Sequence, residues 1–252
     1  MESLAAGARE GVPVVLRDAG KVFLAHRFVL RHIDLTFAPG ERVALFGHNG
    51  AGKSTLIRMI AGLLRPTEGG VTVGGVAPWD AGKGAAARAH IGLLSHQTYL
   101  YDDLTPLENL VLYGQLYGLT DARGRAAGLL EAVGLTGAAN RPVRTLSRGM
   151  QQRAALARAT LHDPSVLLLD EPETGLDAAA RRKLEEVATQ DAPGRTMVLA
   201  THNLELGMSV TDRWIILDGG RVAHDTTSKE TDGAEFRELY SRIVERSQVA
   251  AH

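Results

Sequence analysis

Hydrophobic and polar positions form short blocks of two kinds, which predict strands toward both ends of the chain and helices in its middle. Aliphatic or alternating runs of strand length occur at residues 12–18, 28–37, 42–46, 71–73, 91–94, 166–169, 196–200 and 213–217. Helical spacing of apolar positions occurs at residues 54–63, 106–117, 122–133, 151–162, 178–190 and 203–210, and in a last amphipathic stripe of Phe236, Leu239, Tyr240, Ile243 and Val244.

The order of these blocks predicts an α/β fold. The run at 166–169 does not alternate, which is typical of a parallel strand covered on both faces. The strands at 12–18 and 28–37 precede a Pro39-Gly40 turn and favour a small antiparallel layer. From 98 to 162 the strand signals stop, so we expect an α-helical insertion in a mostly parallel sheet.

A glycine-rich loop between the strand at 42–46 and the next helix organises the chain. It has the spacing G-x-x-x-x-G-K-[ST] in the residues Gly47, His48, Asn49, Gly50, Ala51, Gly52, Lys53, Ser54 and Thr55. Its glycines allow successive backbone N–H groups to surround phosphate oxygens, and the helix N-terminus adds positive potential. In this interpretation Lys53 contacts the β- and γ-phosphates and the Ser54 hydroxyl binds Mg²⁺.

Composition narrows the remaining possibilities. The 252 residues contain 28 Lys and Arg against 29 Asp and Glu, so the charge balance argues against a dedicated nucleic-acid binder. The absence of cysteine excludes disulfides, thiolate metal sites and cysteine nucleophiles. We find no secretory signal at the first residues and no apolar run of membrane-spanning length, so a membrane role is expected to require a partner.

Four further motifs follow the loop in a set order, and with them the chain resembles the ATP-binding-cassette (ABC) ATPases, a class of P-loop NTPase. Residues 166–171 (Val-Leu-Leu-Leu-Asp-Glu) resemble the Walker B element, and residues 146–153 (Leu-Ser-Arg-Gly-Met-Gln-Gln-Arg) resemble the signature motif. Gln97 resembles the Q-loop glutamine, residues 173–177 the D-loop, and His202 the switch histidine. The resemblance implies ATP and Mg²⁺ as cofactors.

It also implies a role for each residue of the hydrolytic site. Asp170 would hold Mg²⁺ largely through its water shell, together with Ser54. Glu171 would act as the general base for the attacking water. Gln97 would place its amide oxygen on Mg²⁺ or on that water, and the His202 imidazole would hydrogen-bond the γ-phosphate or the water.

The signature motif departs from the family pattern Leu-Ser-Gly-Gly-Gln at two positions. Arg148 replaces the first glycine and Met150 replaces the glutamine. Ser147 would cap the next helix, and that N-terminus with the Gly149 N–H would bind γ-phosphate. Since backbone donors survive a side-chain change, we expect residues 147–150 to contact nucleotide, as we do Asp177 of the D-loop.

An aromatic ring before the loop is expected to stack on adenine. Phe23 and Phe28 are the two candidates, and Phe23 is the one assigned to the nucleotide site. Core packing is the alternative role for either ring.

The resemblance divides the chain into a nucleotide-binding core, first part (1–97), an α-helical subdomain (98–162), the second part of the core (163–230) and a C-terminal helix (231–252). It implies a dimer, homomeric or heteromeric, in which each signature completes the site of the other subunit. It also implies a transmembrane permease as partner and a peripheral position on the cytoplasmic face of the membrane, with no direct contact to nucleic acid.

The motif around Gln97 indicates a particular subfamily of these ATPases. The pattern Ser-His-Gln-Thr-x-Leu-Tyr-Asp-Asp-Leu-Thr-x-x-Glu-Asn-Leu, from Ser95 to Leu110, looks like the ATP-binding subunit of the cytochrome c maturation, or haem-exporter, system (CcmA). Alternatives are an exporter of drugs, lipids or polysaccharide, a soluble cassette ATPase acting on ribosomes or DNA, and a nucleotide-binding module without turnover.

Overall fold

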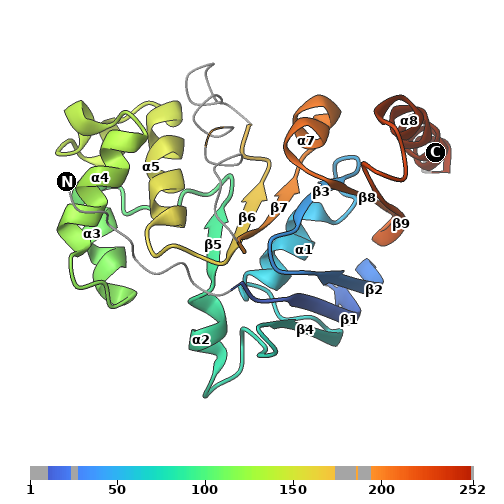
Figure 1. Cartoon of the computed structure of the whole chain (residues 1–252), viewed down its shortest axis with the longest axis horizontal. Coiled ribbons are helices and arrows are strands. Elements are labelled where there is room, and N and C mark those ends of the chain that lie inside the picture. The colour runs from blue at the N-terminus through green and yellow to red at the C-terminus, as the bar shows by residue number, and fades with distance from the viewer. Residues whose placement is uncertain (1–10, 24–27, 174–185, 187–193, 251–252) are drawn as a thin grey trace.

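The computed structural model describes residues 11–23, 28–173, 186 and 194–250 (Figure 1). Two β-sheets with helices between and around them form the body of the molecule, and a group of helices gathers at one end. The predicted α/β fold, with a mostly parallel sheet, an antiparallel layer and a helical insertion, is confirmed.

The larger sheet has six strands in the order β5-β6-β7-β3-β8-β9. Neighbouring strands are parallel except at the edge, where β9 runs antiparallel to β8. The strands are β3 (Arg42–Phe46), β5 (Ile91–Leu94), β6 (Val166–Asp170), β7 (Thr196–Ala200), β8 (Arg213–Asp218) and β9 (Arg221–Thr227). Strand β3 lies between β7 and β8, so the loop after it opens at the centre of the sheet's carboxyl edge.

The smaller sheet is antiparallel, in the order β2-β1-β4. Its strands are β1 (Val14–Val22), β2 (Phe28–Phe37) and β4 (Glu68–Val73). Two predictions were inaccurate here. Strand β1 extends beyond residue 18, and β4 begins at Glu68 rather than at the predicted residue 71.

Helix α1 (Lys53–Ile60) lies between the two sheets and follows the glycine-rich loop (Figure 1). Its Leu56, Ile57, Met59 and Ile60 are fully buried and join one core with the inner faces of both sheets. The sequence of strand β6 does not alternate because both faces of the strand are buried. Leu168 faces this core, whereas Leu167 and Leu169 face a second one. Burial of both faces therefore confirms that interpretation of the run.

The second core joins β5, β6 and β7 to the helices at the end of the molecule. These are α3 (Pro106–Leu116), α4 (Ala122–Ala132) and α5 (Arg148–Thr160). Thr105 caps α3 in a capping box with Glu108, which accounts for the start of this helix. Helix α5 begins at Arg148 rather than at the predicted 151, because Ser147 caps it by accepting the Met150 N–H.

Helices α7 (Leu204–Val210) and α8 (Gly233–Ala250) cover the face of the larger sheet that lies opposite α1. Phe236 of α8 is fully buried, with ring centroids 5.4 Å from Phe46 and 5.0 Å from Trp214. Phe46 is the last residue of β3, so α8 supports the strand that leads into the glycine-rich loop. Core packing is therefore the role the structure gives to the apolar stripe of this helix.

Replacing Phe236 with leucine is expected to lower the free energy of unfolding by about 1–2 kcal/mol, because both ring contacts are lost while most of the volume remains. Denaturant unfolding of the purified chain measures this change. Glu238, on the exposed face of the same helix, is the control, and Glu238→Gln should leave the midpoint unchanged. An unchanged midpoint in Phe236→Leu would show that α8 contributes little to the core.

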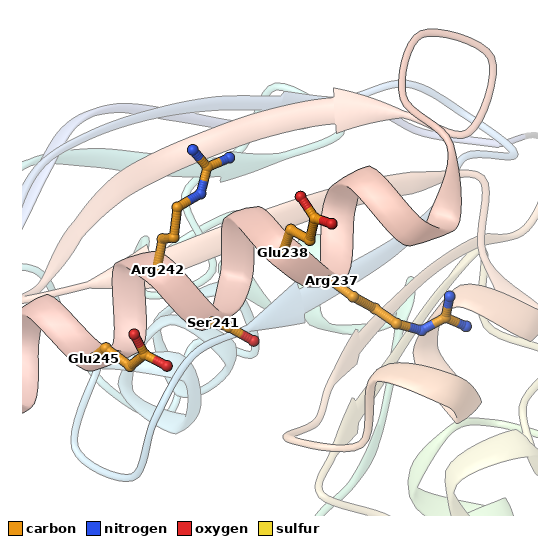
Figure 2. A pocket seen from close by; sticks show the side chains of 5 residues that line it. All are labelled: Arg237, Glu238, Ser241, Arg242 and Glu245. Atoms are coloured by element: carbon orange, nitrogen blue, oxygen red, sulfur yellow. The ribbon is translucent and has the colours of Figure 1, made fainter.

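The exposed face of α8 carries a shallow pocket of about 420 Å³ (Figure 2). All five side chains that line it come from this one helix: Arg237, Glu238, Ser241, Arg242 and Glu245. None of them is a predicted site residue, and Arg237 is already paired with Glu205 of α7 at 2.9 Å. The pocket is thus a solvated helix surface, separate from the predicted chemistry.

Within the described part of the chain, no helix combines the length and the apolarity needed to cross a bilayer.

Candidate functional site: a phosphate loop at the sheet edge

The glycine-rich loop has the backbone that only glycine adopts without strain. Gly52 has φ of 107° and is the N-cap of α1, with no side chain capping the helix. At Gly47 an added Cβ would lie 2.4 Å from the Leu217 carbonyl oxygen. The first N–H groups of α1 consequently face the loop, where they can donate hydrogen bonds to an anion.

Lys53 brings its positive charge into the same loop. Its side chain is only 4% exposed, and Nζ donates to the carbonyl oxygens of Gly47 at 2.8 Å and His48 at 3.3 Å. Nζ also lies 3.6 Å from Glu171 Oε1. A buried ammonium surrounded by oxygens is well placed to take phosphate oxygens in their stead.

Two oxygen ligands meet beside the lysine. The Ser54 hydroxyl donates to Asp170 Oδ1 at 2.8 Å, and burial raises the pKa of Asp170 despite this hydrogen bond. A divalent cation here would offset the cost of burying the carboxylate, and hydroxyl and carboxylate oxygens are the ligands that Mg²⁺ prefers. The described residues contain no cluster of three or more His, Asp or Glu side chains suited to a metal, so phosphates and water would complete the coordination.

Glu171 occupies a strained position at the end of β6. Its φ is +47°, which is uncommon for a residue other than glycine, and its N–H donates to the Ala200 carbonyl at 2.8 Å. The conformation directs its carboxylate to Lys53 and places Oε1 3.9 Å from Nδ1 of His202. Four predicted residues, Lys53, Asp170, Glu171 and His202, thus meet around the loop.

The sequence placed one acid beside this group in the D-loop motif at 173–177 but assigned no role to its side chain. Glu173 is buried and accepts a hydrogen bond from the Thr201 hydroxyl, which in turn accepts the Asn203 N–H at 2.9 Å. It therefore fixes the turn that carries His202.

His48 also has a partner that the sequence did not predict. Its Nε2 lies 3.3 Å from Asp218 Oδ1, and its Nδ1 lies 2.7 Å from the Asn49 carbonyl oxygen. Asp218 ends β8, next to β3, so the parallel pairing of the two strands brings it to the loop. This contact orients the His48 side chain, whereas Lys53 holds the His48 carbonyl.

Neither the signature residues 147–150 nor Gln97 is joined to the loop at 47–55 by a hydrogen bond or ion pair between described residues. Gln97 is exposed after β5, and its neighbour His96 contacts Arg148 of the signature, with Arg148 Nη2 2.7 Å from Nε2. Asp177 lies outside the described residues.

The two candidate aromatics differ in their surroundings. Phe23 is 46% exposed at the end of β1, with Lys21 Nζ 5.5 Å from its ring centroid. Phe28 is half-buried, and the Arg31 guanidinium already covers its ring at 4.3 Å. The exposed ring of Phe23 is the one more available to a base.

Replacing Phe23 with alanine is expected to weaken ATP binding about tenfold, because stacking of an aromatic ring on a base contributes about 1–3 kcal/mol. Titration of the purified chain with ATP measures the effect, and kcat at saturation should not change. Phe28→Ala serves as the matched control. Equal losses in both variants would remove the assignment of the adenine contact to Phe23.

The site combines a phosphate-binding loop and a buried lysine with a serine–aspartate oxygen pair and an acid beside a histidine. This combination is that of a P-loop nucleoside triphosphatase. The family model for the ABC transporter matches residues 30–174. The chain belongs to this family, as an ATP-binding subunit with the cassette ATPase fold.

Relatives extend the match over most of the chain. It is 37% identical to the ABC transporter ATP-binding protein NatA of Bacillus subtilis (strain 168), over 84% of this chain and 88% of that protein. It is 41% identical to the Nod factor export ATP-binding protein I of Azorhizobium caulinodans, over 77% of this chain and 61% of that protein. It is 36% identical to the aliphatic sulfonates import ATP-binding protein SsuB of Albidiferax ferrireducens, over 94% of this chain and 84% of that protein.

A solved structure gives the same fold. A dimeric ATP-binding cassette in a post-hydrolysis state, bound to ADP and Pi, superposes with a TM-score of 0.75 at 30% identity, over 85% of this chain and 98% of that one. The predicted family is therefore confirmed, whereas the narrower haem-exporter resemblance is not reflected in the names of these relatives.

Proposed function

We propose that this chain hydrolyses ATP with Glu171 as the general base, in the site formed by the loop at 47–55 and the ends of β6 and β7. The observation that carries the proposal is the position of the Glu171 carboxylate, 3.6 Å from Lys53 Nζ and 3.9 Å from His202 Nδ1. A carboxylate held between a phosphate-binding cation and an imidazole can take the proton of a water aimed at the γ-phosphate.

The other residues position charge rather than react. The loop N–H groups and Lys53 hold the phosphates, while Ser54, Asp170 and Gln97 supply oxygen ligands for Mg²⁺. When bound, Mg²⁺ neutralises charge on the β- and γ-phosphate oxygens. Phe23 stacks on the adenine, and Glu173 keeps His202 in reach through Thr201.

The active species is a dimer in which the signature residues 147–150 of one copy complete the phosphate site of the other, with Asp177 at the same interface. Two observations support this. The signature makes no hydrogen bond or ion pair with the loop among the described residues of its own chain, and a structural relative is a dimer with ADP and Pi bound.

ATP-driven dimerisation then serves a separate membrane permease, with the chain bound at the cytoplasmic face. The sequence from Ser95 to Leu110 is the basis for proposing haem export as the cargo role. The relatives carry other names, both Nod factor export and sulfonate import, so transport of another substrate is the alternative. The absence of a basic surplus in the composition favours either over action on nucleic acid.

The test is the identity of what co-purifies from membranes. We would express Glu171→Gln in the native cell, solubilise membranes with ATP present, and identify bound proteins by mass spectrometry. A parallel preparation of Lys53→Met controls for contacts that do not require ATP. Multi-span proteins that handle haem or cytochrome c maturation would support the proposed cargo.

Other outcomes separate the parts of the proposal. Co-purification of a different permease would support the transport role and overturn haem as the cargo. Ribosomes, DNA or no partner at all would overturn the transport role, while leaving the ATPase site to be judged from its own kinetics.

A further inference from the structure

Helix α5, which begins in the signature, holds the segment around Gln97 at three points. The Arg158 Nη2 donates to the Leu93 carbonyl at 2.6 Å, and its Nε donates to the Thr98 carbonyl at 3.1 Å. Gln152 Nε2 lies 3.4 Å from the Ser95 carbonyl oxygen. These contacts fasten both ends of residues 93–98 to one helix.

The Arg158 guanidinium is itself fixed. It is buried, and its centre lies 5.5 Å from the Tyr99 ring and 5.4 Å from the Tyr113 ring. A planar guanidinium with several fixed donors and aromatic rings nearby has little freedom to move. The base of the Gln97 segment is therefore rigid with respect to α5.

The tip of the segment contacts Arg148, which replaces the first glycine of the family signature pattern. Arg148 Nη2 lies 2.7 Å from His96 Nε2 and 3.2 Å from its Nδ1, so the guanidinium contacts the imidazole ring of the residue directly before Gln97. The Gln97 carbonyl accepts the Ser95 hydroxyl at 2.9 Å, which leaves the exposed Gln97 side chain as the part of the tip that can move. With glycine at position 148, as in the family pattern, no side chain would reach His96.

From these contacts we infer that Arg148 is a positioning residue for Gln97, acting through His96. The inference rests on the hydrolytic role proposed for Gln97. It makes the departure from Leu-Ser-Gly-Gly-Gln a functional feature: contact at the signature of one copy is passed to the Gln97 of the same copy. Arg148 thus acts on the site of its own chain, in addition to any contact with the partner's nucleotide.

The test is a double-mutant cycle on kcat and KM for ATP, with Arg148→Ala, Gln97→Ala and the double variant in the full chain. We expect Arg148→Ala to lower kcat about five- to tenfold, the size expected for the loss of one ordinary hydrogen-bonding contact, with KM within about twofold. In the Gln97→Ala background the same change should have no further effect. His96→Ala should reproduce Arg148→Ala.

Arg144→Ala is the matched control, since Arg144 is an exposed arginine of the same helical region. It is paired with Asp103 and, among the described residues, makes no hydrogen bond or ion pair with residues 93–98. It should leave kcat and KM unchanged. If Gln97→Ala alone lowers kcat and the double variant loses kcat by the product of the two single losses, only the positioning role of Arg148 is overturned. An unchanged kcat in Gln97→Ala would instead overturn the role proposed for Gln97 itself.

Discussion

Replacing Glu171 with glutamine is expected to abolish steady-state phosphate release, with a loss in kcat of about a hundred- to ten-thousandfold. Glutamine has the same shape and can still accept from Lys53 and His202, but it cannot take a proton. ATP affinity should therefore remain within about twofold, because the phosphate ligands are unchanged. Phosphate release and ATP titration on the same preparation measure the two effects.

The left-handed backbone at Glu171 bears on this result. A conformation of this kind costs roughly 1–3 kcal/mol for a residue other than glycine and persists where its surroundings require it. Glutamine tolerates the conformation no worse than glutamate does, so folding should not change. Glu205→Gln, at an exposed acid paired with Arg237, is the control for the substitution itself. Turnover at the wild-type rate in Glu171→Gln would falsify the general-base assignment.

The parts of the fold that could be predicted are those in which local pattern and tertiary burial agree. Residues 166–169 were predicted as a strand because every position is aliphatic, and the structure buries both faces of the strand that they form. Strand β4 was missed in part because Glu68-Gly69-Gly70 has turn composition, and its pairing with Gly20 and Arg17 of β1 is a contact between distant segments. No local pattern contains that partner.

Two further elements had weak signals for other reasons. Strand β9 was not predicted, because it is a polar edge strand whose exposed positions carry Arg221, Ala223 and Asp225. Helix α2 (Gly84–Arg88) is short and rich in alanine and glycine, so it has no apolar stripe to detect. In both cases the neighbouring structure, and not the local sequence, decides the conformation.

The site, too, has parts that the local sequence predicts and parts that it does not. The loop at 47–55 and the pair Asp170-Glu171 are contiguous motifs, which spacing can find. The contacts between them join residues far apart: Ser54 and Asp170 are separated by 116 positions, and Arg148 and His96 by 52. Such pairs arise from the order of strands in the sheet and the placement of α5, neither of which a linear motif contains.

Replacing Lys53 with methionine is expected to remove ATP binding and hydrolysis together. The side chain is buried, and methionine keeps most of its stem while removing the charge. Loss of charge-assisted contacts to two phosphates should weaken ATP binding by about a hundredfold or more, since each contributes about 1.5–3 kcal/mol. ATP-dependent thermal stabilisation, which is about 2.7 kcal/mol at a hundred times Kd, should fall to near zero at the same ATP concentration.

Lys229→Met, at an exposed position after β9, is the control and should retain both activities. The two site variants then separate binding from chemistry: Glu171→Gln binds ATP without turnover, whereas Lys53→Met does neither. Removing Lys53 also leaves the Glu171 carboxylate without its cation at 3.6 Å, so the folded state of the variant must be checked by denaturant unfolding. A folded Lys53→Met protein that still binds ATP with wild-type affinity would show that the loop N–H groups alone hold the phosphates, because they are the donors that remain.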